Sequence, residues 1–221
     1  MNIIDSALGL IAPHICIGCG REGAVLCRSC VLTYPTLPSI CYICARATTH
    51  NTPCQEHTTI HGPQRVYIAG EYTGILRELI HAYKFDYRRA AAEDIALFLD
   101  MVVPFLSDVT ITYVPATGAH MRERGFNHIK NVSKTFASIR KVPHAETLIR
   151  TSAVTQKGAN KITRKKQLKG AFKALPAKVN NKNFLLIDDV ITTGATIEEC
   201  ARLLYGAGAQ SVSVAAVART P

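Results

Sequence analysis

The sequence predicts an α/β protein, in which a parallel sheet is flanked by helices and preceded by a small cysteine-rich module. From residue 65 onward, apolar segments with strand-like and helix-like spacing alternate. The segment 184–187 is apolar at every position, which is typical of a strand buried on both faces. Seven of the eight cysteines lie before residue 55. We therefore expect a cysteine-rich module at 1–62 and an α/β domain at 63–221, and a chain of 221 residues is long enough for both.

The predicted helices and strands follow one another in a regular order. They are a strand within 65–72, helices over 74–85 and 89–106, a strand within 109–116, a helix ending near Arg140, a strand at 184–187, a helix from Gly194 and a strand at 211–219. One face of the helix that follows Gly194 carries apolar residues at helical spacing, namely Ile197, Cys200, Ala201 and Leu204. Strands that alternate with helices in this way imply a parallel sheet.

The cysteines of the first module occur in pairs separated by two residues, and a histidine completes the last pair. The eight side chains are Cys16, Cys19, Cys27, Cys30, Cys41, Cys44, Cys54 and His57. Zinc takes four thiolate or imidazole ligands in a tetrahedron, so these residues fit two closed structural zinc sites of a double zinc ribbon. The alternative is a set of buried or redox-active thiols. The sequence leaves open which pairs share a metal. Because the module has few large apolar residues, we expect metal to supply its stability.

Two adjacent carboxylates, Asp188 and Asp189, end the apolar strand, and the segment Thr192–Thr196 follows them. The carboxyl ends of parallel strands are where open α/β sheets bind ligands. A turn rich in threonine and glycine that opens a helix presents N–H groups and hydroxyls, which suits a phosphate. We expect both acids to face solvent at the strand end. A helix cap or a metal site is the alternative interpretation of such a pair of acids.

The chain carries a formal net charge of +10, and the charge is unevenly distributed. Between Arg150 and Lys182 there are ten lysines and arginines and no acidic residue. One interpretation is a solvated surface segment. The other is a surface that binds anions such as the phosphates of single-stranded DNA. For that surface the candidate residues are Arg164, Lys165, Lys166 and Lys169.

The chain has no apolar run long enough to span a membrane, which requires about 18 residues. Its first residues lack a basic leader and include Asp5, so we expect no signal peptide. Pairs of cysteines in a reducing compartment favour metal binding over disulfides. We therefore expect a cytoplasmic protein.

The segment FLLIDDVITTGAT, residues 184–196, resembles the phosphoribosyl-diphosphate (PRPP) motif of type I phosphoribosyltransferases. In that motif an apolar strand is followed by two acids and then by a Thr-Thr-Gly-x-Thr loop. The resemblance implies that Asp188 and Asp189 bind the ribose hydroxyls. It also implies that the 5′-phosphate is bound by the loop Thr192, Thr193, Gly194, Ala195 and Thr196.

Three further segments narrow the resemblance to the ComF family of DNA-uptake (competence) proteins. They are ELIHAYKF at 78–85, RERGFNH at 122–128 and TSAVTQKGANKITRKKQLKGAF at 151–172. The family looks like a zinc module fused to a phosphoribosyltransferase-like domain. It usually carries a basic residue after the second predicted strand, where this chain reads ATGAHM. The resemblance therefore assigns diphosphate binding to Lys84, Arg122 and Arg124, with Mg²⁺ bound mainly through PRPP and water.

Two functions of different classes follow from the resemblance. The first is a competence accessory protein that binds PRPP and single-stranded DNA and works with other competence proteins, such as a helicase or a recombination mediator. The alternative is an active phosphoribosyltransferase that transfers the phosphoribosyl group from PRPP to a nucleobase or another acceptor. The sequence contains no recognisable acceptor pocket, and it assigns no catalytic residue.

Overall fold

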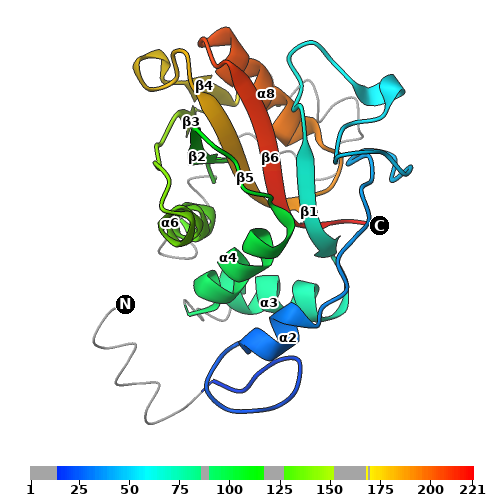
Figure 1. The fold of residues 1–221 in the computed structure, drawn as a ribbon. Helices are drawn as coiled ribbons and strands as arrows, with labels where there is room; N and C mark the ends of the chain where they lie inside the picture. Colours follow the sequence, from blue (N-terminus) through cyan, green and yellow to red (C-terminus); the bar gives the residue numbers. More distant parts are fainter. Residues whose placement is uncertain (1–13, 86–89, 117–126, 152–167, 169) are drawn as a thin grey trace.

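The structure is a computed structural model that describes residues 14–85, 90–116, 127–151, 168 and 170–221. Its centre is a four-stranded parallel sheet in the order β1-β6-β5-β2 (Figure 1). The strands are β1 (Val66–Glu71), β2 (Val109–Tyr113), β5 (Asn183–Ile191) and β6 (Ser211–Arg219). All five residues of β2 are buried. Both faces of the sheet are therefore covered, as the apolar strands predict.

Helices cover the sheet on both faces (Figure 1). One face carries α3 (Gly74–Phe85), α4 (Ala91–Val102) and α6 (His128–Arg140). The other face carries α8 (Ala195–Gly206) together with a small antiparallel pair, β3 (Leu148–Arg150) and β4 (Phe172–Ala174). A short 3₁₀ helix, η2 (Pro176–Lys178), links β4 to β5. Each face has its own cluster of buried apolar side chains, so the molecule has two hydrophobic cores.

The cysteine-rich head lies against both of these cores. Its first half contains α2 (Arg28–Leu32) and contributes Val25, Leu26 and Val31 to the core under α3 and α4. Its second half contains η1 (Gln55–His57) and contributes Tyr42 to the core under α8. Figure 1 shows α2 beside α3 and α4, far from the short cyan helix η1. The two halves of the head are thus separated in space as well as in sequence.

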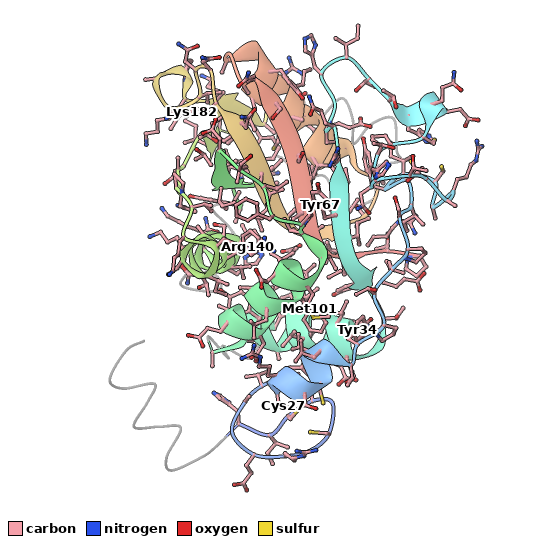
Figure 2. The ribbon with its side chains drawn as sticks, viewed as in Figure 1. Cys27, Tyr34, Tyr67, Met101, Arg140 and Lys182 are labelled. Atoms are coloured by element: carbon pink, nitrogen blue, oxygen red, sulfur yellow. The ribbon has the colours of Figure 1, made fainter. Side chains whose placement is uncertain are left out.

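Specific contacts fix the first half of the head to the domain. The backbone N–H of Leu26 donates to Asp94 Oδ2 of α4 over 2.9 Å. The rings of Tyr34 and Phe98 meet edge to face, with centroids 5.2 Å apart. Figure 2 shows Cys27 and Tyr34 at the end of the molecule opposite Lys182. Burial raises the pKa of Asp94 to about 6, because the carboxylate has little access to water there.

The predicted α/β fold class is confirmed, and several boundaries match closely. Helix α3 and strand β6 have the predicted bounds. Helix α4 is shorter than predicted, since it ends at Val102, two residues before Pro104. Strand β5 is longer than predicted and includes both acids. Within the described residues, no helix is long and apolar enough to span a membrane.

Candidate functional site

The two acids lie at the end of β5, beside the place where its neighbour β2 stops. Tyr113, the last residue of β2, pairs with Ile187, so Asp188 and Asp189 extend past it while β5 continues to pair with β6. The side chains of successive strand residues point to opposite faces, and the backbone N–H of Asp189 donates to Asp188 Oδ1 over 2.9 Å. Because the acids lie just past the carboxyl end of the parallel strand β2, they are placed where open α/β sheets bind ligands.

Asp189 is held by two side chains from two different helices. Its Oδ2 lies 2.6 Å from Nζ of Lys84, in the last turn of α3. The same oxygen lies 2.5 Å from Nε2 of His128, the first residue of α6. The side chain of Asp189 is only 19% exposed, so the expectation that both acids face solvent is wrong for this residue. Burial alone would raise the pKa of Asp189, but Lys84 and His128 outweigh burial and hold it well below its usual range.

Asp188 has the opposite electrostatic character. It is half-buried, and burial together with the negative charge of Asp189 raises the pKa of its carboxyl to about 8. The surroundings of Asp189 thus favour its ionised form, whereas those of Asp188 favour its protonated form. A protonated carboxyl can donate a hydrogen bond as well as accept one, whereas a carboxylate only accepts. Such a pair suits the hydroxyls of a sugar, which are both donors and acceptors.

The predicted phosphate loop leads directly into α8. Gly194 is the N-cap of the helix and has a φ of +77°, a conformation that glycine adopts without strain. Thr193 Oγ1 accepts from the backbone N–H of Ala195 over 3.4 Å. Thr192 is exposed, while Thr193 and Thr196 are half-exposed. The first N–H groups of a helix have no partner within the helix, so this turn can receive a phosphate.

The described structure brings together most of the residues predicted for the sugar phosphate. Asp188, Asp189, Lys84 and the loop 192–196 meet at one edge of the sheet. Two predicted diphosphate ligands, Arg122 and Arg124, lie outside the described residues. The predicted DNA-binding residues Arg164, Lys165, Lys166 and Lys169 also lie outside them.

His128 is a site residue that sequence reasoning missed. Its neighbour Asn127 caps α6, because the side chain of Asn127 accepts from the backbone N–H of Lys130 over 3.1 Å. The hydroxyl of Tyr83 donates to the carbonyl of His128 over 2.9 Å and fixes the start of the helix next to α3. No pattern in the sequence connects His128 with an acid 61 residues later.

The eight predicted metal ligands gather into two groups, each formed by consecutive pairs. The groups are Cys16, Cys19, Cys27 and Cys30, and Cys41, Cys44, Cys54 and His57, with the candidate ligand atoms of each group within 4.8 Å of one another. Representative Sγ–Sγ distances are 3.8 Å for Cys16–Cys30 and 3.7 Å for Cys44–Cys54. Four sulfurs about 2.3 Å from one zinc would lie about 3.8 Å apart, so both groups could hold structural zinc.

Residues 126–221 match the phosphoribosyl transferase domain family. The chain is 30% identical over 226 residues to the DNA utilization protein YhgH of Escherichia coli strain K12, and the match covers 96% of this chain and 99% of the relative. It is 27% identical over 169 residues to competence protein F of Haemophilus influenzae, covering 70% of this chain and 72% of the relative. One solved structure, described as the allosteric regulatory enzyme of purine biosynthesis, aligns with a TM-score of 0.41 and 20% identity over 57% of this chain and 25% of its own.

The parallel sheet, the acid pair at its edge and the matched domain define a phosphoribosyltransferase-like protein with a cysteine-rich head. Within that class, the chain belongs to the family that contains YhgH and competence protein F, the ComF family. The resemblance seen in the sequence motifs is thereby confirmed.

Proposed function

We propose that this protein is a ComF-type accessory protein of DNA uptake and utilisation that binds PRPP with Mg²⁺ at the edge of its sheet and single-stranded DNA at a separate basic surface. The observation that carries the PRPP site is the junction of Asp189 with Lys84, next to the start of α8. The names of the relatives, DNA utilization protein and competence protein, support the biological role. We further propose that it acts in the cytoplasm with other competence proteins, such as a helicase or a recombination mediator.

In the proposed complex, each group of PRPP meets residues of suitable chemistry. The ribose hydroxyls bind to Asp188 and Asp189, and the 5′-phosphate binds to the turn 192–196. Lys84 neutralises Asp189 in the free protein. When the sugar hydroxyls bind Asp189, the ammonium of Lys84 becomes available to the diphosphate, with Arg122 and Arg124 as further cations. Mg²⁺ would supply positive charge to the diphosphate, mainly through oxygens of PRPP and water.

The basic surface is proposed to bind DNA away from the sugar-phosphate site. Of the basic run, Lys173, Lys178 and Lys182 are exposed among the described residues. Lys178 and Lys182 immediately precede β5, so they lie near its amino end, whereas the acids lie at its carboxyl end. Figure 2 shows Lys182 at the same end of the molecule as the start of β5. Because Lys178 and Lys182 lie at the opposite end of β5 from the acids, these two lysines and the acids can be changed independently.

Calorimetric titration with PRPP and Mg²⁺, and separately with a single-stranded oligonucleotide, tests both parts of the proposal. The charge-assisted bond from the carboxylate of Asp189 to a ribose hydroxyl contributes about 1.5–3 kcal/mol, and a bond from the neutral carboxyl of Asp188 contributes about 0.5–1.5 kcal/mol. Asp188→Asn combined with Asp189→Asn should therefore abolish PRPP binding and leave DNA binding in place. Because Asp189→Asn leaves Lys84 without its carboxylate, the single variant Asp188→Asn serves as the milder change. If the double variant bound PRPP as tightly as the wild type, the assignment of the ribose site would be wrong.

A matched change tests the DNA surface. Replacing both Lys178 and Lys182 by glutamate should weaken binding of single strands and flatten its salt dependence, by about 0.7 in the log–log slope for each phosphate that the protein no longer neutralises. PRPP affinity should not change. Charge reversal at Arg164, Lys165 and Lys166 should have a similar effect. A wild-type protein that does not bind single strands at low salt would end the DNA-binding proposal.

The second candidate is an active phosphoribosyltransferase. One observation favours it: the side chain of Lys84 is 15% exposed, and its ammonium lies beside the acid proposed to hold the ribose, where a leaving diphosphate requires a cation. Release of pyrophosphate from PRPP in the presence of individual nucleobases tests this activity. Release that depends on one base and is lost in Lys84→Met would establish the enzyme. PRPP binding without release would leave the accessory role.

A further inference from the structure

Tyr42 connects the second cysteine group with the phosphate loop. It lies between two candidate metal ligands, Cys41 and Cys44, and is 1% exposed. Its ring packs so closely on Gly194 that a Cβ added there would lie 2.6 Å from Cε2 of the tyrosine. The same Cβ would lie 3.4 Å from Cγ1 of Ile43. The two residues inside the Cys41–Cys44 knuckle thus form the support on which the loop rests.

Polar contacts extend this support along α8 and β6. The hydroxyl of Tyr42 donates to Glu198 Oε1, in the first turn of α8, over 3.3 Å. The Nε of Arg219, the last residue of β6, lies 3.5 Å from the carbonyl oxygen of Tyr42. Arg219 is 8% exposed and pairs in register with Ile191, the last residue of β5. The knuckle is therefore attached directly to α8, and it reaches the end of β5 through Arg219 of the neighbouring strand β6.

The position of Tyr42 depends on the ligands that flank it. Within the second group, Nδ1 of His57 lies 3.6 Å from Sγ of Cys41 and 3.1 Å from Sγ of Cys54. A metal bound by four such side chains closes the chain from 41 to 57 into one rigid unit. Without a metal, three thiols and an imidazole give weak restraint, because their mutual hydrogen bonds involve sulfur, a poor donor and acceptor.

The first cysteine group provides an internal comparison. Its half of the head packs on α4, through Asp94 and Phe98, and contributes to the core on the other face of the sheet. Tyr42 and Gly194 lie on the α8 side of the molecule. Among the described residues, the half of the head that holds the first group therefore packs on the opposite face of the sheet from Tyr42.

We propose that the second cysteine group is a metal-dependent support for the phosphate loop, with Tyr42 as the positioning residue, so that metal loading at Cys41, Cys44, Cys54 and His57 controls binding of a sugar phosphate at 192–196. Metal loss releases the knuckle, the ring of Tyr42 leaves Gly194, and the start of α8 loses the geometry that presents its N–H groups. The ligand part of this inference rests on the proposed PRPP site. The mechanical part, support of the loop, does not.

The test uses amide hydrogen exchange of peptides that cover 190–198, with zinc content and PRPP/Mg²⁺ calorimetry measured on the same full-length samples. Cys44→Ser removes one ligand of the second group, and Cys19→Ser is its counterpart in the first. Tyr42→Ala removes the ring and keeps all eight ligands, whereas Tyr42→Phe keeps the ring and removes only the hydroxyl. Peptides from α6, on the other face of the sheet, report general destabilisation.

We expect Cys44→Ser and Tyr42→Ala to speed exchange in 190–198 and to weaken PRPP binding by about 5-fold to 150-fold, the usual range for coupling between sites. Tyr42→Phe should have a smaller effect, and Cys19→Ser should leave exchange in the loop unchanged. Loop protection equal to the wild type in Cys44→Ser would overturn the inference. Equal acceleration in Cys19→Ser, or in the α6 peptides, would do the same. If calorimetry detects no binding of PRPP to the wild type, the proposed ligand is wrong. The hydrogen-exchange rates of 190–198 then test by themselves whether the second cysteine group supports the loop.

Discussion

At the scale of single residues, Lys84 and Asp189 form an ion pair that is mostly shielded from water, with side chains 15% and 19% exposed. Removing one partner of a buried pair leaves an uncompensated charge, which usually costs about 3–5 kcal/mol. We expect Lys84→Met to approach the lower end of that range, because His128 still contacts Asp189. Urea unfolding at neutral pH measures the loss.

A second ion pair of the same type is the control for this change. Lys130 and Glu146 lie 2.9 Å apart, with side chains 33% and 42% exposed. Pairs exposed to this degree contribute about 0–1 kcal/mol. Lys130→Met should therefore reduce the free energy of unfolding much less than Lys84→Met. Equal losses in the two variants would contradict the electrostatic role given to Lys84.

Asp188 leads to a prediction about pH. Its pKa in the folded chain, about 8, lies above the ordinary value of 3.8. The folded state therefore holds this proton more tightly than the unfolded state, and the carboxyl's contribution to stability is complete below about pH 4 and is lost as the pH rises through about 8. Asparagine does not ionise. The free energy of unfolding of Asp188→Asn, taken relative to that of the wild type, should therefore be higher at pH 9 than at pH 5. Urea unfolding of both proteins at the two pH values measures this change. A difference that does not vary with pH would show that Asp188 is ionised throughout.

At the scale of elements, the turn between β5 and α8 combines positive φ with close packing. Gly194 has a φ of +77° and faces the ring of Tyr42, whereas Gly170 has a φ of +85° and a Cβ added there would meet no atom of the described residues within 4 Å. A left-handed conformation costs a residue with a Cβ about 1–2 kcal/mol. Gly170→Ala should lose about that amount. Gly194→Ala should lose a further 1–3 kcal/mol or so, because the new Cβ forces the ring of Tyr42 away. Thermal unfolding of the two variants compares them, and similar losses would contradict the close contact.

The elements also show how far the sequence reveals the fold and the site. Both ends of helix α3 were predicted to the residue. Its apolar side chains recur at helical spacing from Gly74 to Phe85, and the sequence on either side, Thr73 and the segment 86–89, breaks this pattern. Strands β3 and β4 were missed, since a strand of three residues carries almost no periodicity. The acids and the phosphate loop are contiguous in sequence and were found as one motif. The contact of Tyr42 with Glu198 spans 156 residues, and such a contact follows only from the packing of the folded chain.

At the scale of the whole molecule, the cysteine-rich head and the α/β domain share their hydrophobic cores. Val25, Leu26 and Val31 belong to the core beneath α3 and α4, and Tyr42 belongs to the core beneath α8. Purified protein should contain close to two zinc ions per chain, one for each group of four ligands. Because both halves of the head are built into the domain, we expect zinc to stabilise the entire chain.

Chelation tests this expectation. Structural zinc contributes several kcal/mol to folding, and 1 kcal/mol shifts the Tm of a chain of this size by about 2–4 °C. Removal of both ions should therefore lower the Tm by about 10 °C or more, in a single cooperative transition followed by circular dichroism. Zinc release, followed with a colorimetric chelator, should coincide with that transition. If the head instead lost its zinc and its structure while the remaining chain melted at the original temperature, the shared cores would contribute little, and the head would be an independent module.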